Sequence, residues 1–204
     1  MTRDEEKRII ESVIAGNTQD FEKLVLENQN QVYNLALRMV GNEQDAWDIS
    51  QDAFIKAFRS LDSFRGDSKF SVWLYRLTSN ICLDFLRAKK RNNVVSLTGF
   101  SPEEDEGTEL EIPDERFSPD NLMDKRELHD ALDSALRQLP EDQREILLLR
   151  EISGLSYEEI AGSLGLEPGT VKSRIFRARK KLCKLLLQSG NFLSLQTSYR
   201  TKGV

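Results

Sequence analysis

The stretch "LSYEEIAGSLGLEPGTVKSRIFRARKKL", residues 155–182, decides how the C-terminal part of the chain folds. Ser156 and Glu159 stand three residues apart, which is the spacing of a capping box at the start of a helix. Gly165 then permits a tight turn, and Pro168 suits the first position of the helix that follows. A helix, a short turn with glycine and a second helix together predict a helix-turn-helix.

The second helix of this motif is basic, whereas the whole chain carries a net charge of -5. Residues 169–182 contain six Lys or Arg and no acid. At about 100° per residue, one face gathers apolar side chains and is expected to face the core. Its members are Val171, Ile175, Ala178, Leu182 and Leu185. The opposite face presents a phenylalanine among cations, which suits thymine methyls, phosphates and base edges better than a solvated surface. The predicted DNA-binding residues are Lys172, Ser173, Phe176, Arg177 and Lys180.

The acidity of the chain is concentrated in one segment. Residues 101–120 hold nine acids against one arginine, for a net charge of -8, while 1–100 sum to zero and 121–204 to +3. This segment also holds three of the five prolines and lacks helical periodicity, so it is interpreted as a linker. We therefore expect an all-α fold of two small helical domains joined by an acidic flexible linker. The expected boundaries are 1–95 for the first domain, 96–122 for the linker, 123–188 for the helix-turn-helix domain and 189–204 for a flexible tail.

Two helices of the first domain show clear patterns. From Asn42, a plausible N-cap, the apolar residues fall on one face of a helix. They are Ala46, Ile49, Ala53, Ala57 and Leu61. A further helix is expected over about 71–90, with apolar residues on two opposite sides. Such a helix is either deeply buried or has a binding face.

Cysteine and histidine usage excludes most catalytic and metal sites. Cys82 and Cys183 lie far apart and cannot form a metal quartet or a disulfide framework, which favours a reducing cytoplasm. The single histidine, His129, is expected on a helix surface.

No apolar run approaches the roughly 18 residues that span a bilayer, and no signal-peptide pattern is present. We therefore expect a cytoplasmic protein with no metal, no cofactor and no stable membrane insertion. No nucleotide-binding loop or nucleophile–base pair is visible, so enzymatic activity is not expected.

Two blocks of the sequence together resemble the extracytoplasmic-function sigma factors of bacterial RNA polymerase. The first is "DAWDISQDAFIKAFRSLDSFRGDSKFSVWLYRLTSNICLDFLRAKKR" (45–91), and the second is "LPEDQREILLLREISGLSYEEIAGSLGLEPGTVKSRIFRARKKL" (139–182). Helix-turn-helix motifs alone are weakly specific, but the two blocks in this order are highly specific. The resemblance implies a region 2-like first domain, a region 4-like second domain and a protein that directs promoter-specific transcription initiation. It also implies three partners, which are core RNA polymerase (the β′ clamp helices and the β flap), promoter DNA and an anti-sigma factor.

The resemblance further implies which residues make each contact. Those matching the clamp-binding positions are Asp48, Gln51 and Asp52, although family members often carry Glu where this chain has Asp52. The first domain is expected to recognise and melt the minus-ten element, a task that requires stacking rings and phosphate-binding cations. The residues implied for it are Phe64, Arg65, Ser68, Lys69, Phe70, Arg76 and Asn80. The resemblance implies that the minus-thirty-five element is read by the outward face of the second helix of the helix-turn-helix.

Some alternatives remain open at the level of sequence. Phe64, Phe70 and Trp73 are alternatively core residues, which we expect of Trp73 and of one of the two phenylalanines. Arg174 and Arg179 either grip phosphates or form intramolecular pairs. A stand-alone helix-turn-helix regulator is the alternative function. It would need a dimer interface or a ligand pocket, and it would have no reason to carry the acidic clamp-binding block.

Overall fold

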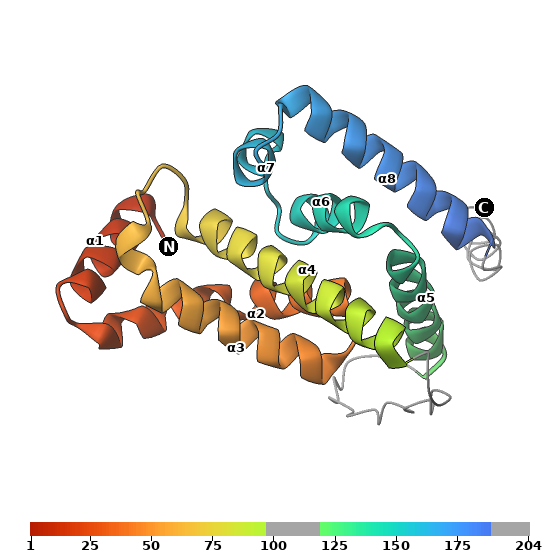
Figure 1. The fold of residues 1–204 in the computed structure, drawn as a ribbon, viewed down its shortest axis with the longest axis horizontal. Coiled ribbons are helices and arrows are strands. Elements are labelled where there is room, and N and C mark those ends of the chain that lie inside the picture. Colours follow the sequence, from red (N-terminus) through yellow and green to blue (C-terminus); the bar gives the residue numbers. More distant parts are fainter. Residues whose placement is uncertain (97–118, 189–204) are drawn as a thin grey trace.

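The computed structural model describes residues 1–96 and 119–188, with the side chains of 1–91 and 128–188. In these ranges all regular secondary structure is helical, which confirms the predicted all-α fold (Figure 1). The α-helices are α1 (Arg3–Ile14), α2 (Phe21–Val40), α3 (Glu43–Arg59), α4 (Phe70–Ser96), α5 (Pro119–Arg137), α6 (Glu141–Glu151), α7 (Tyr157–Leu164) and α8 (Pro168–Gln188). Two 3-10 turns are η1 (Thr18–Asp20) and η2 (Leu61–Ser63). Most of the segment expected as a linker lies outside the described residues, as does the expected tail, and α5 begins inside the range 96–122.

The N-terminal helices α2, α3 and α4 pack into one bundle. The predicted apolar face of α3 is buried, and its alanines allow a close approach to its neighbours. Asn42 begins this helix as predicted, because its side-chain oxygen accepts a hydrogen bond from the Asp45 amide at 2.9 Å. Gly41 ends α2 in the left-handed conformation, with φ of 75°, which only glycine adopts without strain.

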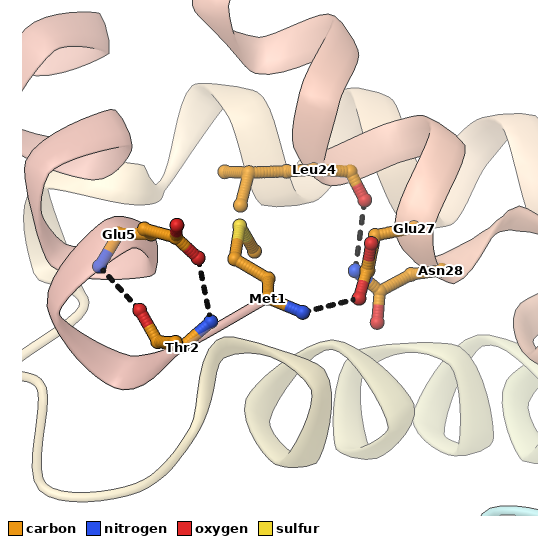
Figure 2. Close-up of polar contacts among 6 residues, drawn as sticks. All are labelled: Met1, Thr2, Glu5, Leu24, Glu27 and Asn28. Atoms are coloured by element: carbon orange, nitrogen blue, oxygen red, sulfur yellow. Dashed lines mark hydrogen bonds and ion pairs between the residues drawn. The ribbon is translucent and has the colours of Figure 1, made fainter.

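An ion pair ties the start of the chain to α2 (Figure 2). Thr2 and Glu5 form a reciprocal capping box for α1, and the hydrogen bonds from the Thr2 backbone and hydroxyl lower the pKa of the Glu5 carboxyl. The Met1 amino group lies 2.9 Å from a carboxylate oxygen of Glu27 on α2. The next residue of α2, Asn28, donates from its side-chain amide to the Leu24 carbonyl one turn earlier in the same helix, at 2.8 Å. The first turn of α1 is therefore held in one place.

The C-terminal helices contain the predicted helix-turn-helix. Ser156 and Glu159 form the capping box of α7, with hydrogen bonds of 2.8 and 3.1 Å. Gly165 ends that helix with φ of 65°, and α8 begins at Pro168. Apolar side chains of α6, α7 and α8 fill the space between these helices, and burying each contributes about 1.5–3 kcal/mol. The largest fully buried ones are Ile146, Leu149, Ile160, Val171 and Ile175.

The two groups of helices pack against each other through α2 and α4. Helix α2 contacts α5 and α6, while α4, which packs with α2 and α3, also contacts α6 and α7 (Figure 1). Of the apolar side chains of α4, Val72 and Leu74 are buried, while Leu77, Ile81, Leu83 and Phe85 are half-buried against the core, so packing covers much of both apolar sides. The helix also runs to Ser96, six residues beyond the predicted end at 90.

Charged residues take part in the contact between the two groups, beside apolar side chains of both. The Arg38 guanidinium lies 2.6 Å from the Asp133 carboxylate, and Lys90 pairs with Glu141. Arg144 of α6 donates to the Met39 carbonyl at the end of α2, and only 6% of Arg144 is exposed. Its neighbour Glu145 is 7% exposed.

Burial shifts the proton affinities of both α6 residues. It lowers the pKa of Arg144 and raises the pKa of the Glu145 carboxyl. The hydroxyl of Ser79 on α4 acts in the opposite direction and lowers the pKa of Glu145. The pKa of the nearby Cys82 thiol rises to about 12, chiefly because that side chain is buried. Since charged groups are costly to remove from water, this interface is less favourable than an apolar one of equal area.

Candidate nucleic-acid interface

The outward face of α8 is the most prominent candidate surface. All five residues predicted to bind DNA are exposed, and they are Lys172, Ser173, Phe176, Arg177 and Lys180. The Phe176 ring is 68% exposed, whereas Val171, Ile175 and Ala178 on the opposite side are at most 1% exposed. A large exposed ring flanked by cations can contact apolar base edges while the cations contact phosphates.

Two hydrogen bonds shape this face locally. The Ser173 hydroxyl donates to the Thr170 carbonyl at 2.9 Å, and Arg177 Nε donates to the Ser173 carbonyl at 3.3 Å. In contrast, Arg179 points back to the C-terminal helices, where it pairs with the Glu151 carboxylate and donates to it from Nε at 3.0 Å. Of the two alternatives left open for Arg179, the structure shows the intramolecular pair.

The second candidate surface is the loop between η2 and α4, residues 64–69. It borders a hollow of about 660 Å³. Three of the predicted cations line this hollow, namely Arg65, Lys69 and Arg76, and all three are exposed. Arg3 of α1 also lines it, and sequence reasoning missed this residue because nothing in the N-terminal pattern links it to the loop. The four cations can each contact a phosphate, although the carboxylate of Asp67 on the same loop lines the hollow beside them.

Two aromatic rings, Phe64 and Trp73, line the hollow, and a third ring, Phe70, packs behind them. The ring centroids of Phe64 and Trp73 are 5.3 Å apart, and Phe70 lies 6.1 Å from Phe64 and 5.8 Å from Trp73. Phe70 is fully buried, so its ring cannot contact a base in this structure and belongs to the core, contrary to its predicted direct role. Phe64 and Trp73 are half-buried and line the hollow, which leaves them able to stack on a base, so Trp73 is only in part the core residue that was expected from the sequence.

The remaining predicted residues of this surface differ in position. Ser68 lines the hollow, and its hydroxyl donates to the Lys69 carbonyl at 3.2 Å. Asn80 is exposed one turn beyond Arg76, outside the residues that line the hollow. On the other side of the hollow stand Glu158 and Glu159 of α7. The loop 64–69, which is predicted to contact the minus-ten element, and helix α7 of the helix-turn-helix thus line opposite sides of the same hollow.

A third surface lies on the exposed side of α3. Asp48, Gln51 and Asp52 are all exposed there. Beside them Trp47 is 59% exposed, and its ring packs edge-on against Tyr33 with centroids 6.4 Å apart. Trp47 was not among the residues predicted from the sequence, although a helical wheel that buries Ala46 and Ile49 also points this tryptophan outward. Acceptors beside a large apolar ring suit a partner that carries both cations and apolar side chains.

Comparison with known proteins identifies the family. Residues 24–92 match the family model Sigma-70 region 2, and residues 129–182 match Sigma-70, region 4. The chain is 41% identical over 187 residues to the RNA polymerase sigma-H factor of Pseudomonas aeruginosa, covering 91% of this chain and 96% of that protein. It is 42% identical over 180 residues to the ECF RNA polymerase sigma-E factor of Escherichia coli, covering 85% and 90%. The chain belongs to the extracytoplasmic-function sigma factors.

Solved structures agree with this assignment. This sigma factor resembles CnrH, solved in complex with the cytosolic domain of CnrY, with a TM-score of 0.64, 27% identity and coverage of 89% of this chain and 96% of that one. It also resembles RpoE of Bartonella quintana, solved in complex with the anti-sigma factor NepR, with a TM-score of 0.64 and 31% identity. That match covers 82% of this chain and 97% of the other.

The family assignment decides the function at the level of the whole protein. This sigma factor recognises promoters together with core RNA polymerase, so the alternative of a stand-alone regulator is excluded. Sigma factors are not a family of enzymes. In residues 1–96 and 119–188, helices long and apolar enough to span a membrane are absent.

Proposed function

We propose that this sigma factor divides promoter recognition among the three surfaces described above. Residues 1–95 act as region 2, residues 96–122 join the domains, residues 123–188 act as region 4, and 189–204 form a tail. In this proposal the outward face of α8 reads the minus-thirty-five element. The observation that carries it is the 68% exposed Phe176 ring set among exposed cations, because a ring in that place lowers solubility and needs a partner.

The loop 64–69 and the start of α4 recognise and melt the minus-ten element. A base that leaves the stack needs an aromatic surface, for which Phe64 and Trp73 are placed, and its strand needs cations. Arg65, Lys69 and Arg76 supply these, with Ser68 at the rim of the hollow. Asn80 lies a turn beyond and contacts the neighbouring part of the strand in this scheme.

The exposed side of α3 binds the β′ clamp helices through Asp48, Gln51 and Asp52, while region 4 contacts the β flap. Because its partner is RNA polymerase, this sigma factor acts in the cytoplasm. An anti-sigma factor is a further proposed partner. Its support is that two sigma factors of similar fold were solved in complex with CnrY and with the anti-sigma factor NepR.

The test starts with holoenzyme reconstituted from core RNA polymerase and the full chain. A duplex library randomised upstream of a transcribed region is selected for transcripts, which yields a promoter that this sigma factor uses, whatever its sequence. On that promoter, Phe64→Ala and Asn80→Ala are expected to leave holoenzyme formation and closed-complex binding intact. They should slow strand opening, which permanganate reactivity of unpaired thymines reports.

A matched control for Phe64→Ala is Phe58→Ala, which removes a partly exposed ring of α3 outside the hollow. Opening rates equal to wild type for Phe64→Ala, together with a lower melting temperature, would mean that Phe64 serves only the core. Loss of polymerase affinity in both Phe64→Ala and Asn80→Ala would place these residues in the clamp contact instead.

A further inference from the structure

Helix α1 lies outside both matched family regions, which cover 24–92 and 129–182, yet it contacts the proposed minus-ten loop and the residue that follows it, the first of α4. Arg3 Nη2 donates to the carbonyl oxygen of Gly66 at 3.1 Å. Glu6 Oε1 accepts a hydrogen bond from the backbone amide of Phe70 at 2.9 Å. We propose that Arg3 and Glu6 are positioning residues for strand opening, which hold the loop 64–69 in the shape that receives a base. This inference rests on the proposed function of that loop.

The contact from Arg3 meets the loop where its backbone is most unusual. Gly66 has φ of 75°, in the left-handed region, and a Cβ atom there would meet open space. The loop itself therefore supplies no packing that fixes this turn. A hydrogen bond from Arg3 to the Gly66 carbonyl restrains the orientation of that peptide, and with it the direction of the exposed side chains on either side.

The contact from Glu6 fixes the other end of the loop. Phe70 is the first residue of α4, and the first amides of a helix have no partner within that helix. Because Phe70 is fully buried, its amide gains a needed acceptor from the Glu6 carboxylate. The carboxylate also lies at the positive end of the α4 dipole, which strengthens the contact. Glu6 thus acts as a helix cap supplied by another helix.

Helix α1 is rigid enough to serve as this support. Its first turn is held by the capping box of Thr2 and Glu5 (Figure 2), and its inner face buries Ile10 and Val13 in the core. A side chain on a fixed helix can position a loop, whereas one on a frayed end cannot. Arg3 in addition places a fourth cation at the hollow lined by Arg65, Lys69 and Arg76.

The test uses the full chain first and the holoenzyme second. Amide hydrogen exchange is measured for Arg3→Ala and Glu6→Ala. Their controls are Lys7→Ala and Glu11→Gln, which remove like charges from the exposed side of α1. Loss of one loop hydrogen bond is expected to speed exchange of the amides at 65–70 about five- to tenfold in the first pair and not in the controls. Glu6→Gln keeps an acceptor oxygen and should restore most of the protection.

In the holoenzyme, the same variants are tested on a promoter selected with the wild-type protein. Arg3→Ala and Glu6→Ala should slow strand opening about five- to tenfold while polymerase affinity stays unchanged, with Glu6→Gln close to wild type. A role in mere folding would instead lower the melting temperature and the polymerase affinity together, and that result would overturn the inference.

The outcomes separate this inference from the proposed function. If Phe64→Ala and Arg76→Ala slow opening but Arg3→Ala and Glu6→Ala match their controls, α1 has no positioning role and the proposed function stands. If none of the four variants slows opening, the proposed function of the loop fails. A third outcome also counts against the inference. If the amides of the loop exchange faster in Arg3→Ala and Glu6→Ala but the rate of strand opening is unchanged, the shape of the loop does not matter for melting.

Discussion

At the scale of single residues, cations that look alike in the sequence differ in what they contact. Arg177 and Arg179 stand two positions apart on α8, but Arg179 is held by Glu151 while Arg177 lies on the exposed face. A cation already paired within the protein contributes less to DNA binding, because binding must first break that pair. The position on the helix therefore decides which of the two is available for base contact.

Replacing Arg177 is expected to weaken promoter binding through the minus-thirty-five element. Arg177→Ala should cost roughly 1–3 kcal/mol if the guanidinium contacts a base edge, and it should relax the preference at that base pair. Fluorescence anisotropy of holoenzyme with the selected promoter and single-base variants measures both effects. Arg8→Ala, which removes an exposed cation of α1, serves as control. If the affinity fell by the same factor for every promoter variant, Arg177 would instead contact a phosphate.

Reversing the charge of Asp52 is expected to affect a different partner. Asp52→Arg should weaken binding to core RNA polymerase at least about tenfold, because it places a cation where an acceptor is proposed to meet cations. Glu22→Arg, an equal charge reversal on the exposed side of α2, is the matched control. Polymerase pull-downs with Asp52→Arg, Glu22→Arg and Arg177→Ala separate the surfaces. Equal losses for Asp52→Arg and Arg177→Ala would show that the surfaces are assigned wrongly.

At the scale of elements, the helix-turn-helix depends on short-range devices at its ends. The helix α7 has only eight residues, too few to be stable without its caps and its tertiary packing. The capping box at Ser156 satisfies two amides at the start, and Gly165 permits the left-handed turn that leads to α8. These devices set the angle at which α8 leaves the C-terminal core.

Removing the cap of α7 should lower stability without touching the DNA-facing residues. Ser156→Ala is expected to reduce the free energy of unfolding by about 1 kcal/mol, since the Glu159 amide loses its acceptor. Ser156→Asp, which keeps an acceptor, should retain most of the stability. Urea unfolding, followed by circular dichroism, gives the free energy of unfolding of both variants. The slope of this free energy against urea concentration should be the same as in wild type. Equal midpoints for Ser156→Ala and wild type would show that packing alone holds α7.

At the scale of the whole molecule, the long helix α4 is shared by both groups of helices. Its partners include the surface of α6 on which Arg144 and Glu145 are removed from water. The same packing brings Glu158 and Glu159 to the hollow that the loop 64–69 borders. In the proposed function, a DNA strand that enters the hollow would meet these carboxylates on one side, which opposes its contact with the cations.

The buried carboxyl of Glu145 should make this packing dependent on pH. Burial raises its pKa above the ordinary value of 4.5, against the effects of Ser79 and Arg87, while Asp142 adds to the rise. Between the ordinary and the raised pKa the folded protein binds more protons than the unfolded chain. The free energy of unfolding therefore falls as pH rises through that window, and it stays lower above it.

The variant Glu145→Gln tests this dependence. It removes the ionisable group, so its melting temperature should exceed that of wild type at neutral pH, and the gap should shrink as pH falls towards the ordinary pKa. Thermal unfolding from about pH 4 to about pH 9 measures the gap, with Glu22→Gln on the exposed side of α2 as control. A gap that is the same at every pH would mean that the carboxyl is not desolvated in solution.

The sequence by itself determined the local structure of this protein. Capping residues, turn glycines and the helical period act between residues close along the chain, so the helix-turn-helix and the apolar faces of α3 and α8 could be predicted. The exposed set on α8 followed from the same period, because a residue opposite a buried face is exposed. The resemblance of two sequence blocks to a family led to the remaining site residues.

Only the tertiary structure decided what depends on contacts between distant segments. The burial of Phe70 and the pairing of Arg179 with Glu151 follow from how helices pack, and no short-range pattern encodes them. The same holds for Arg3 and Glu6, which are 63 and 64 positions from the loop residues that they contact. The two-sided apolar pattern of α4 allowed either burial or a binding face. Contacts between distant helices decided between the two: most of these side chains are buried or half-buried against the core, while Trp73 at the start of the helix lines the hollow.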